Sequence, residues 1–326
     1  MPANLTPEYE KAEKRHREAT TDEERLAALR EMLRAIPKHK GTEKMQADLK
    51  RRISQFRKVA GKKTASKGPD PFHIPKGGAG QVILVGPPNV GKSMLAAATT
   101  NAPVKVADYP YATAVPLPGM WRYEDAQIQL IDTPPVTADH VPAGLMSTIR
   151  SSEAICIVVD LAAEPLAQAE LALDLLTGRG LVLRSVPRAQ LDPGDRNQRS
   201  GLLVANKSDL VSPETVVALR DLYADRLEVW PVSAATGEGL EALRERVWQL
   251  LSVLRVYTKK PGQPPENEHP FTLPIGSTIE DLAREIHREL PETMRSARIW
   301  GGGRFDGQHV HRTEVLRDKD VVEIHE

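Results

Sequence analysis

The chain has 326 residues, of which 40% are hydrophobic and 27% are charged, and its 44 basic side chains balance 44 acidic ones. This length indicates two or three modest domains rather than one. The sequence holds no long apolar run and begins with a charged stretch, so we expect a cytoplasmic protein without a membrane segment or signal peptide. Its single cysteine, Cys156, excludes an internal disulfide and a cysteine-rich zinc site.

Residues 1–60 are predicted to form a helical hairpin. Apolar side chains recur there at three- and four-residue steps, and Pro37 and Gly41 interrupt the run. The hairpin ends in a basic segment, 38–67, with eleven Lys and Arg against Glu43 and Asp48. Such a segment favours contact with nucleic-acid phosphates, and a solvated helix face explains the same charges equally well. Residues 61–80, rich in Lys, Gly and Pro, are predicted to be a flexible linker.

From residue 81 to residue 254 short apolar runs alternate with helical stretches. The predicted strands are 81–85, 126–131, 154–159, 202–205 and 227–232, and the predicted helices lie near 91–100, 165–177, 212–224 and 238–253. This alternation predicts an α/β domain with a mostly parallel sheet and helices on both faces. Residues 178–200 are polar and broken by prolines, so we expect a surface loop there.

A phosphate-binding loop follows the first predicted strand. It fits the pattern G-x-x-x-x-G-K-[ST] and consists of Gly86, Pro87, Pro88, Asn89, Val90, Gly91, Lys92 and Ser93. Its backbone N–H groups and the start of the next helix favour phosphates, Lys92 reaches the outer phosphates, and the Ser93 hydroxyl can ligate magnesium. Asp132, at the end of a later strand, can hold the magnesium water shell beside Ser93.

Two further motifs select the base. Asn206, Lys207 and Asp209 follow one strand, and Ser233 and Ala234 follow the next. A carboxylate at Asp209 can accept both donors of guanine, whereas adenine would leave it unpaired. We expect Asn206 to tie this loop to the phosphate loop, the stem of Lys207 to cover the base, and the Ala234 N–H to meet the guanine carbonyl. Four motifs in this order at four strand ends predict a P-loop GTPase domain over 81–254.

A smaller unit follows a proline-rich stretch and spans 255–326. Its predicted order is strand 269–273, helix 278–290, strand 297–300, turn 301–307 and strand 321–325, which indicates a β-grasp fold. Residues 256–326 carry ten basic and thirteen acidic side chains. A net-negative module favours recognition of a protein or of a local shape over general binding to RNA.

The sequence resembles the Obg and Drg branch of translation-associated GTPases, and Drg most closely. The resemblance rests on the stretches GPPNVGKS, ADYPYATAVPLPGMWRYEDAQIQLID, NKSD, VSA, LRVYTKKPGQPP, ARIWG and DKDVVEIHE, and it covers roughly residues 42–59 and 81–326. It implies that 255–326 is a TGS domain, that the protein binds GTP with magnesium and hydrolyses it slowly, and that it acts at the ribosome. Thr113 is then the residue that completes magnesium coordination when the γ-phosphate is present.

The chain departs from that family in several places, and Thr113 stands alone where the family tends to carry two adjacent threonines. The family motif D-x-P-G ends here in Pro135, which has no N–H to donate to the γ-phosphate. Val136 stands where many GTPases carry a water-orienting glutamine, and the family likewise has an apolar residue there. His140 is either a water-positioning base or an ordinary loop histidine. The family's inserted domain between the third and fourth motifs is absent.

These departures leave three hypotheses. The first is a magnesium-dependent GTPase with slow hydrolysis, on the order of 10⁻⁴ to 10⁻² per second, in which Lys92, Thr113 and Asn89 are the catalytic candidates. Asn89 resembles the asparagine of GTPases that hold a potassium ion between the phosphates, and it could equally shape the loop. The second is a guanine-nucleotide-binding scaffold that does not switch, as Pro135 suggests. The third is an RNA-binding adaptor driven by residues 38–67, with a vestigial nucleotide site. The expected partner, beside guanine nucleotide, is the ribosome or rRNA, contacted through 38–67 and the TGS-like domain.

Overall fold

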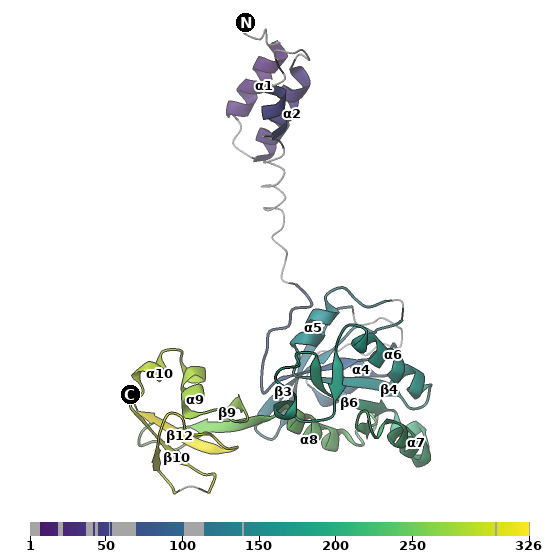
Figure 1. The fold of residues 1–326 in the computed structure, drawn as a ribbon, viewed down its shortest axis with the longest axis vertical. Coiled ribbons are helices and arrows are strands. Elements are labelled where there is room, and N and C mark those ends of the chain that lie inside the picture. Colours follow the sequence, from purple (N-terminus) through teal and green to yellow (C-terminus); the bar gives the residue numbers. More distant parts are fainter. Residues whose placement is uncertain are drawn as a thin grey trace. The chain divides into compact units, whose positions relative to one another are not determined.

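The computed structural model describes residues 7–18, 22–36, 42, 45–51, 53, 70–100, 114–138, 140–303 and 305–325. The chain divides into two compact units, Met1–Asp70 and Pro71–Glu326 (Figure 1). No helix among the described residues is both long and apolar enough to span a bilayer.

The first unit is helical, as predicted. Its elements are α1 (Pro7–Glu18), α2 (Asp22–Ala35) and a further helical stretch over 45–51 and 53. The apolar residues at three- and four-residue steps meet in a small core, which includes Leu29, Met32, Leu49 and Ile53. The helical run before Pro37 is divided into two helices, α1 and α2. Most of the basic segment 38–67 lies outside the described residues.

The second unit begins with a seven-stranded sheet in the order β2-β3-β1-β4-β6-β5, in which β7 also pairs with β6. The strands are β1 (Gln81–Val85), β2 (Leu117–Tyr123), β3 (Ala126–Asp132), β4 (Ala154–Asp160), β5 (Val182–Arg184), β6 (Gln198–Asn206) and β7 (Val229–Pro231). All pairs are parallel except β2 with β3. This is the predicted mostly parallel sheet.

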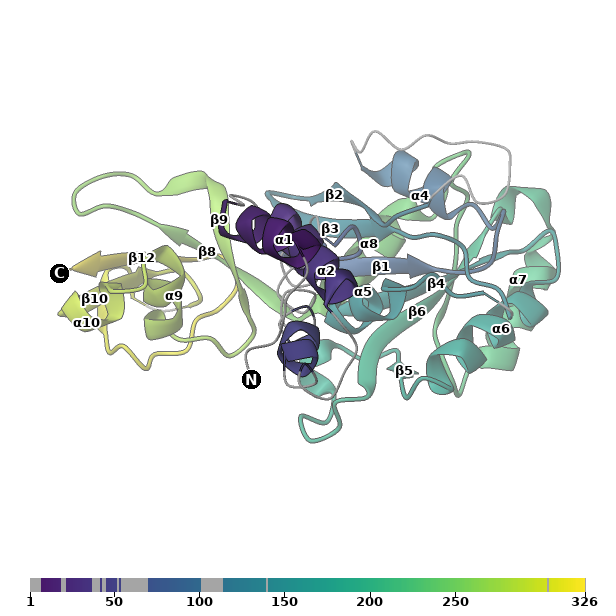
Figure 2. The ribbon, with the colours of Figure 1, turned by 90° about the horizontal axis from the view of Figure 1, so that it is seen from above.

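Helices cover both faces of this sheet (Figure 2). The helices are α4 (Lys92–Thr99), α5 (Leu145–Ser151), α6 (Pro165–Thr177), α7 (Pro213–Tyr223) and α8 (Leu240–Leu251). One core packs α5, α6 and α7 against one face, and the other packs α4 and α8 against the opposite face. The strands β1, β4 and most of β6 are buried along their length, which explains their continuous apolar runs.

Several short elements differ from the prediction. β2, α5 and β5 were not expected, and 178–200 is not a simple loop, because it contains β5, a 3₁₀ turn at Arg188–Gln190 and the start of β6. β2 carries Pro118 and Gly119 and lies at the sheet edge, so its sequence signal is weak. Residues 71–80, expected as linker, pack on the domain: Thr148 donates to the Phe72 carbonyl at 2.5 Å.

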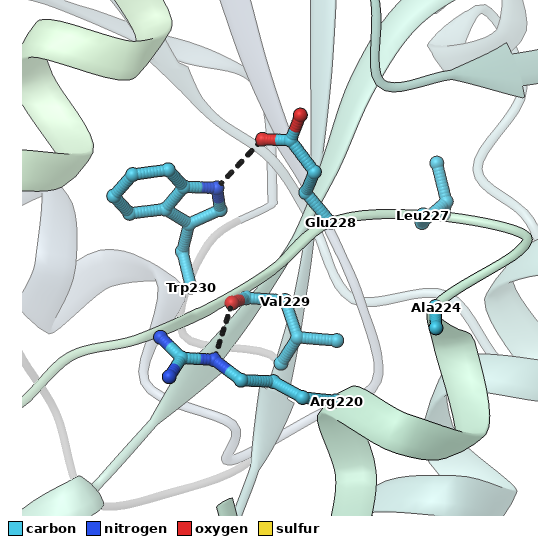
Figure 3. Close-up of a pocket in the computed structure, with 6 residues that line it drawn as sticks. All are labelled: Arg220, Ala224, Leu227, Glu228, Val229 and Trp230. Carbon is cyan, nitrogen blue, oxygen red and sulfur yellow. Dashed lines mark hydrogen bonds between the residues drawn. The ribbon is translucent and has the colours of Figure 1, made fainter. Parts of the chain in front are cut away.

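The short edge strand β7 is protected from further pairing. Arg220 on α7 donates from Nε to the Val229 carbonyl at 3.3 Å, and Pro231 has no N–H to offer. Trp230 donates to Glu228 at 3.2 Å, and these side chains line a pocket of about 280 Å³ at this edge (Figure 3). The pocket does not include any residue of the predicted nucleotide site.

The C-terminal unit is a five-stranded β-grasp sheet in the order β11-β10-β12-β8-β9, which bears out the predicted fold. Its elements are β8 (Val253–Thr258), β9 (Glu266–Pro274), α9 (Ile279–Ile286), α10 (Leu290–Thr293), β10 (Ser296–Trp300), β11 (Gln308–Val310) and β12 (Asp320–His325). β8 and β12 form the central parallel pair. The predicted helix 278–290 corresponds to α9, which ends at Ile286, and α10, β8 and β11 were not predicted.

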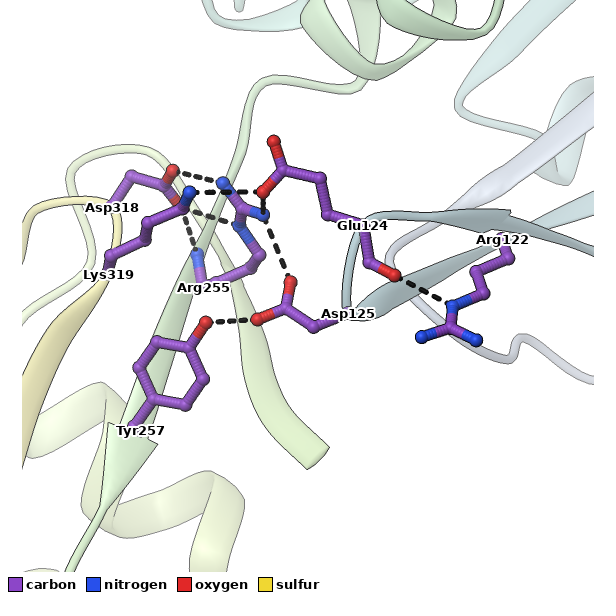
Figure 4. Close-up of polar contacts among 7 residues, drawn as sticks. All are labelled: Arg122, Glu124, Asp125, Arg255, Tyr257, Asp318 and Lys319. Carbon is purple, nitrogen blue, oxygen red and sulfur yellow. Dashed lines mark hydrogen bonds and ion pairs between the residues drawn. The ribbon is translucent and has the colours of Figure 1, made fainter. Parts of the chain in front are cut away.

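Arg255 of β8 joins the β-grasp domain to the turn between β2 and β3 (Figure 4). Its guanidinium contacts Glu124 and Asp125 of that turn and, at 2.6 Å, Asp318 of the β-grasp domain. The side chain is only 4% exposed, and it lies over the Trp248 ring at 5.3 Å. Hydrogen bonds from Arg255 and Lys319 lower the pKa of Glu124. One buried cation therefore neutralises carboxylates from both domains.

We predict that Arg255→Met lowers the free energy of unfolding by about 3–5 kcal/mol, because it leaves Asp125 and Asp318 without their cation and Glu124 with Lys319 alone. The pKa of Glu124 is depressed in the folded protein, so its share of the stability is present at neutral pH and is lost as pH falls through the folded pKa. Urea denaturation at neutral and acidic pH measures both effects. Arg284→Met, which removes an exposed arginine of α9, should cost less than about 1 kcal/mol. Equal losses in the two variants would contradict the prediction.

Candidate nucleotide-binding site

The loop between β1 and α4 has the conformation that a phosphate cradle needs. A Cβ at Gly86 would lie 2.4 Å from the Val158 carbonyl oxygen, and one at Gly91 would lie 2.3 Å from Asn206 Nδ2. Only glycine fits at either position. Asn89 has a φ of 63°, a left-handed conformation that asparagine tolerates better than most residues. This conformation explains an asparagine at position 89 without a bound ion and does not exclude one.

Lys92 is 6% exposed and points back into this loop. Its Nζ donates to the Gly86 carbonyl at 2.9 Å and to the Pro87 carbonyl at 2.8 Å. Burial lowers the pKa of Lys92 to about 8, and the charge of Asp132 opposes that shift. An ammonium held by two carbonyls at the start of a helix is placed to pair with an anion.

Ser93 and Asp132 lie together although 39 residues separate them in sequence. The Ser93 hydroxyl donates to Asp132 Oδ2 at 2.7 Å, and Asp132 is fully buried at the end of β3. A hydroxyl and a carboxylate are the hard oxygen groups that magnesium prefers. The two residues fit the expected magnesium site. Thr113, the third expected ligand, lies outside the residues that the structure describes.

Asn206 connects the phosphate loop with the loop after β7. Its Nδ2 donates to the Val90 carbonyl at 2.9 Å, and its Oδ1 accepts from the Ala234 N–H at 3.0 Å. The first bond is the link expected from the sequence. The second differs from expectation, because that N–H was assigned to the guanine carbonyl. A guanine contact at Ala234 would require this N–H to exchange partners.

The remaining base-loop residues surround the same strand end. Lys207 has a φ of 65°, and its ammonium forms an ion pair with Asp160 at the end of β4. Asp209 is exposed, with its carboxylate free to meet a base, and Ser233 is fully buried and accepts from the Thr236 N–H at 3.1 Å. The sequence analysis did not predict a role for Asp160. The signal was present, because Asp160 is an acid at the end of a buried apolar strand, as Asn206 is a polar residue at the end of another.

The segment after Asp132 is held against the phosphate loop. Val136 donates its N–H to the Gly86 carbonyl at 3.2 Å, and its side chain is fully buried in the sheet core. Pro135 is buried as well, whereas His140 is exposed in a turn with Thr137. Val136 therefore cannot orient a water molecule as a glutamine would.

Comparisons with known proteins agree with this geometry. A family model described as a 50S ribosome-binding GTPase matches residues 81–183, and a TGS domain model matches 254–326. The chain is 30% identical to an uncharacterized GTP-binding protein of Halobacterium salinarum over 93% of this chain and 98% of that protein. It belongs to the TGS-domain GTPases of the Obg/Drg branch. Developmentally-regulated G-protein 1 of Arabidopsis thaliana is 27% identical over 92% of this chain and 90% of that protein.

A solved structure shows the same fold. The YchF GTPase of Schizosaccharomyces pombe, at 14% identity and a TM-score of 0.52, covers 78% of this chain and 100% of that chain. The alignment with the Halobacterium protein extends over 364 positions, more than the 326 residues here. The Halobacterium protein therefore carries residues without a counterpart in the present chain.

We predict that GTP affinity falls as pH rises through about 8. The phosphates need the charged form of Lys92, and in the free protein that charge is lost above a pKa of about 8. Each pH unit above this value should weaken binding by up to about tenfold. Binding of a fluorescent GTP analogue between pH 7 and 9 measures this. Lys92→Arg keeps its proton over this range and should give a flat profile; a flat profile for the unaltered protein would contradict the prediction.

Proposed function

We propose that this GTP-binding protein is a magnesium-dependent GTPase with slow hydrolysis that acts with the ribosome in the cytoplasm. The observation that carries the proposal is the convergence of Lys92, Ser93, Asp132 and Asn206 on one loop. Lys92 is positioned to hold the outer phosphates, and the backbone N–H groups of the loop to hold the inner ones. Bound magnesium would neutralise charge on the phosphates, and Ser93 and Asp132, with Thr113, would hold it.

The slow rate follows from what surrounds this loop. Pro135 has no N–H, and the Val136 side chain lies in the core, so neither supplies a group to the attacking water. Lys92 supplies positive charge near the transferred phosphoryl group, and Asn89 holds the turn beside it. A potassium ion at Asn89 would add a second positive charge there. Hydrolysis on the order of 10⁻⁴ to 10⁻² per second is therefore expected without a partner.

We predict that Asp209→Asn weakens GTP binding at least tenfold and improves binding of xanthosine triphosphate. The variant amide donates to the base carbonyl that replaces the guanine amine, whereas the carboxylate accepts from guanine. Titration calorimetry with both nucleotides and ATP measures the exchange. Asp221→Asn, an exposed acid on α7 outside the site, is the control and should alter neither affinity. Binding of ATP as tight as that of GTP would overturn the base assignment.

A second candidate function is a guanine-nucleotide-binding scaffold that does not switch, and buried Pro135 favours it. We predict that the unaltered protein binds GTP and GDP with affinities within about tenfold, because one γ-phosphate hydrogen bond, worth about 1.4 kcal/mol, is missing. Pro135→Gly should favour GTP selectively, and Pro134→Gly is the matched control.

Single-turnover hydrolysis measured in the same preparations, in potassium and in sodium, distinguishes the two functions. Measurable turnover that is faster in potassium supports a GTPase with a monovalent ion at Asn89. No turnover in either salt supports the scaffold. A strong preference of the unaltered protein for GTP would contradict the role given to Pro135.

A further inference from the structure

Three arginines gather where β4 and β6 begin, at the edge of the sheet opposite the nucleotide loops. Arg150 lies in the last turn of α5, Arg179 follows α6, and Arg199 lies near the start of β6. Arg150 donates from Nη2 to the Arg179 carbonyl, and Arg199 donates from Nη2 to the Arg150 carbonyl at 3.0 Å. Arg199 therefore reaches the backbone of Arg150, and Arg150 reaches the backbone of Arg179, whose own guanidinium donates to the Leu175 carbonyl. We call this set the arginine face.

The charge of the arginine face is only partly balanced by the protein, since the charge of Glu153 acts on Arg199. Among the described residues none of its three guanidinium groups forms an ion pair with a carboxylate. Glu153 lies nearby, but it is paired with Lys76 and is 3.7 Å from Arg188. Burial, together with the charges of Arg150 and Arg188, lowers the pKa of Arg199. A folded protein that gathers cations in this way gains stability from an anion.

Capping of helix ends explains only part of this arrangement. A cation at the carboxyl end of a helix is favourable, and Arg179 donates to the Leu175 carbonyl of α6 at 3.3 Å. One cation for each helix end would satisfy that need. A guanidinium has five N–H groups, and only one nitrogen of Arg150 and one of Arg179 make a protein hydrogen bond among the described contacts. Both side chains are exposed, so their other N–H groups are available to a ligand.

We propose that the arginine face binds the phosphates of a double-stranded RNA backbone. The planar guanidinium group matches phosphate with two parallel hydrogen bonds, and several groups side by side suit a polyanion rather than a single ion. The face contains no aromatic side chain on which unpaired bases could stack, which favours a duplex over a single strand. The inference extends the proposed association with the ribosome and rests on it for the biological partner, but not on the nucleotide site.

The arginine face and the base loop lie at opposite ends of β4. β4 runs from Ala154, next to the arginine face, to Asp160, next to the base loop. Seven residues of strand span roughly 20 Å. RNA and nucleotide can therefore bind at the same time, and RNA affinity should not change between the GDP and GTP forms.

The test replaces Arg150, Arg179 and Arg199 together by glutamine in the full chain. Binding of an RNA duplex of about 20 base pairs is measured across a potassium chloride series, since the slope of log affinity against log salt counts the phosphates neutralised. We expect the slope to fall by about 2 to 3 and the affinity at about 0.1 M salt to fall about 10- to 100-fold. The basic segment 38–67 is unchanged in every variant, so its contribution cancels.

Two matched variants separate binding from structure. Arg284→Gln, Arg288→Gln and Arg295→Gln together remove the same charge from exposed positions of the TGS domain and should leave the slope unchanged. Lysine at positions 150, 179 and 199 keeps the charge and should retain most of the affinity. All variants should bind GTP normally, because the nucleotide loops lie at the other edge of the sheet.

Several results would overturn the proposal. They are an unchanged slope in the triple glutamine variant, an equal loss in the TGS variant, or an equal loss with lysine, which would indicate a structural role. Binding to vesicles of anionic phospholipid that depends on the three arginines, without binding to RNA, would also overturn it. Co-sedimentation with ribosomes is measured in parallel. If the unaltered protein fails to sediment but binds duplex RNA through the arginine face, the proposed function fails and the RNA site stands.

Discussion

The amide of Asn206 is the interaction on which the nucleotide site depends. It joins the carbonyl of Val90 in the phosphate loop to the N–H of Ala234 in the loop after β7, so one buried side chain fixes two loops that are more than a hundred residues apart. A glycine is required at position 91 because a Cβ there would meet this same amide. Parallel strands bring their carboxyl ends to one edge, and the amide sets the spacing of the loops at that edge.

The same edge shows why an intact binding site can be a slow catalyst. The groups proposed to hold a nucleotide, Lys92, Ser93 and Asp132, are all in contact with the phosphate loop or with one another. The groups that would respond to the γ-phosphate are altered, since Pro135 has no N–H and Val136 donates its own N–H to Gly86. In the proposed site, binding and switching would use different atoms, and Pro135 alters only those for switching.

The sequence predicted the parts of this protein that are long, periodic or tied to a motif. Strands such as β1 and β4 are buried on both faces and give unbroken apolar runs, so their ends and the motifs that follow them were predictable. β5 has only three residues, and β8 continues directly from α8 through Ser252 in a left-handed conformation, so neither produced a separate signal. Contacts between distant residues, such as Lys207 with Asp160, depend on the register of β4 and β6, which the sequence did not give.

The β2–β3 hairpin carries Asp132, the carboxylate proposed to hold magnesium, at one end and the joint to the TGS domain at the other. Asp132 ends β3 beside Ser93, while Glu124 and Asp125 form the turn that Arg255 holds. The hairpin is paired through seven residues without a register shift, so its two ends are connected by a stiff element. Arg255 also lies over Trp248 of α8, which packs in the core next to the phosphate loop. The TGS domain is therefore attached to the strand pair that ends at the nucleotide site, through charges that a single substitution removes.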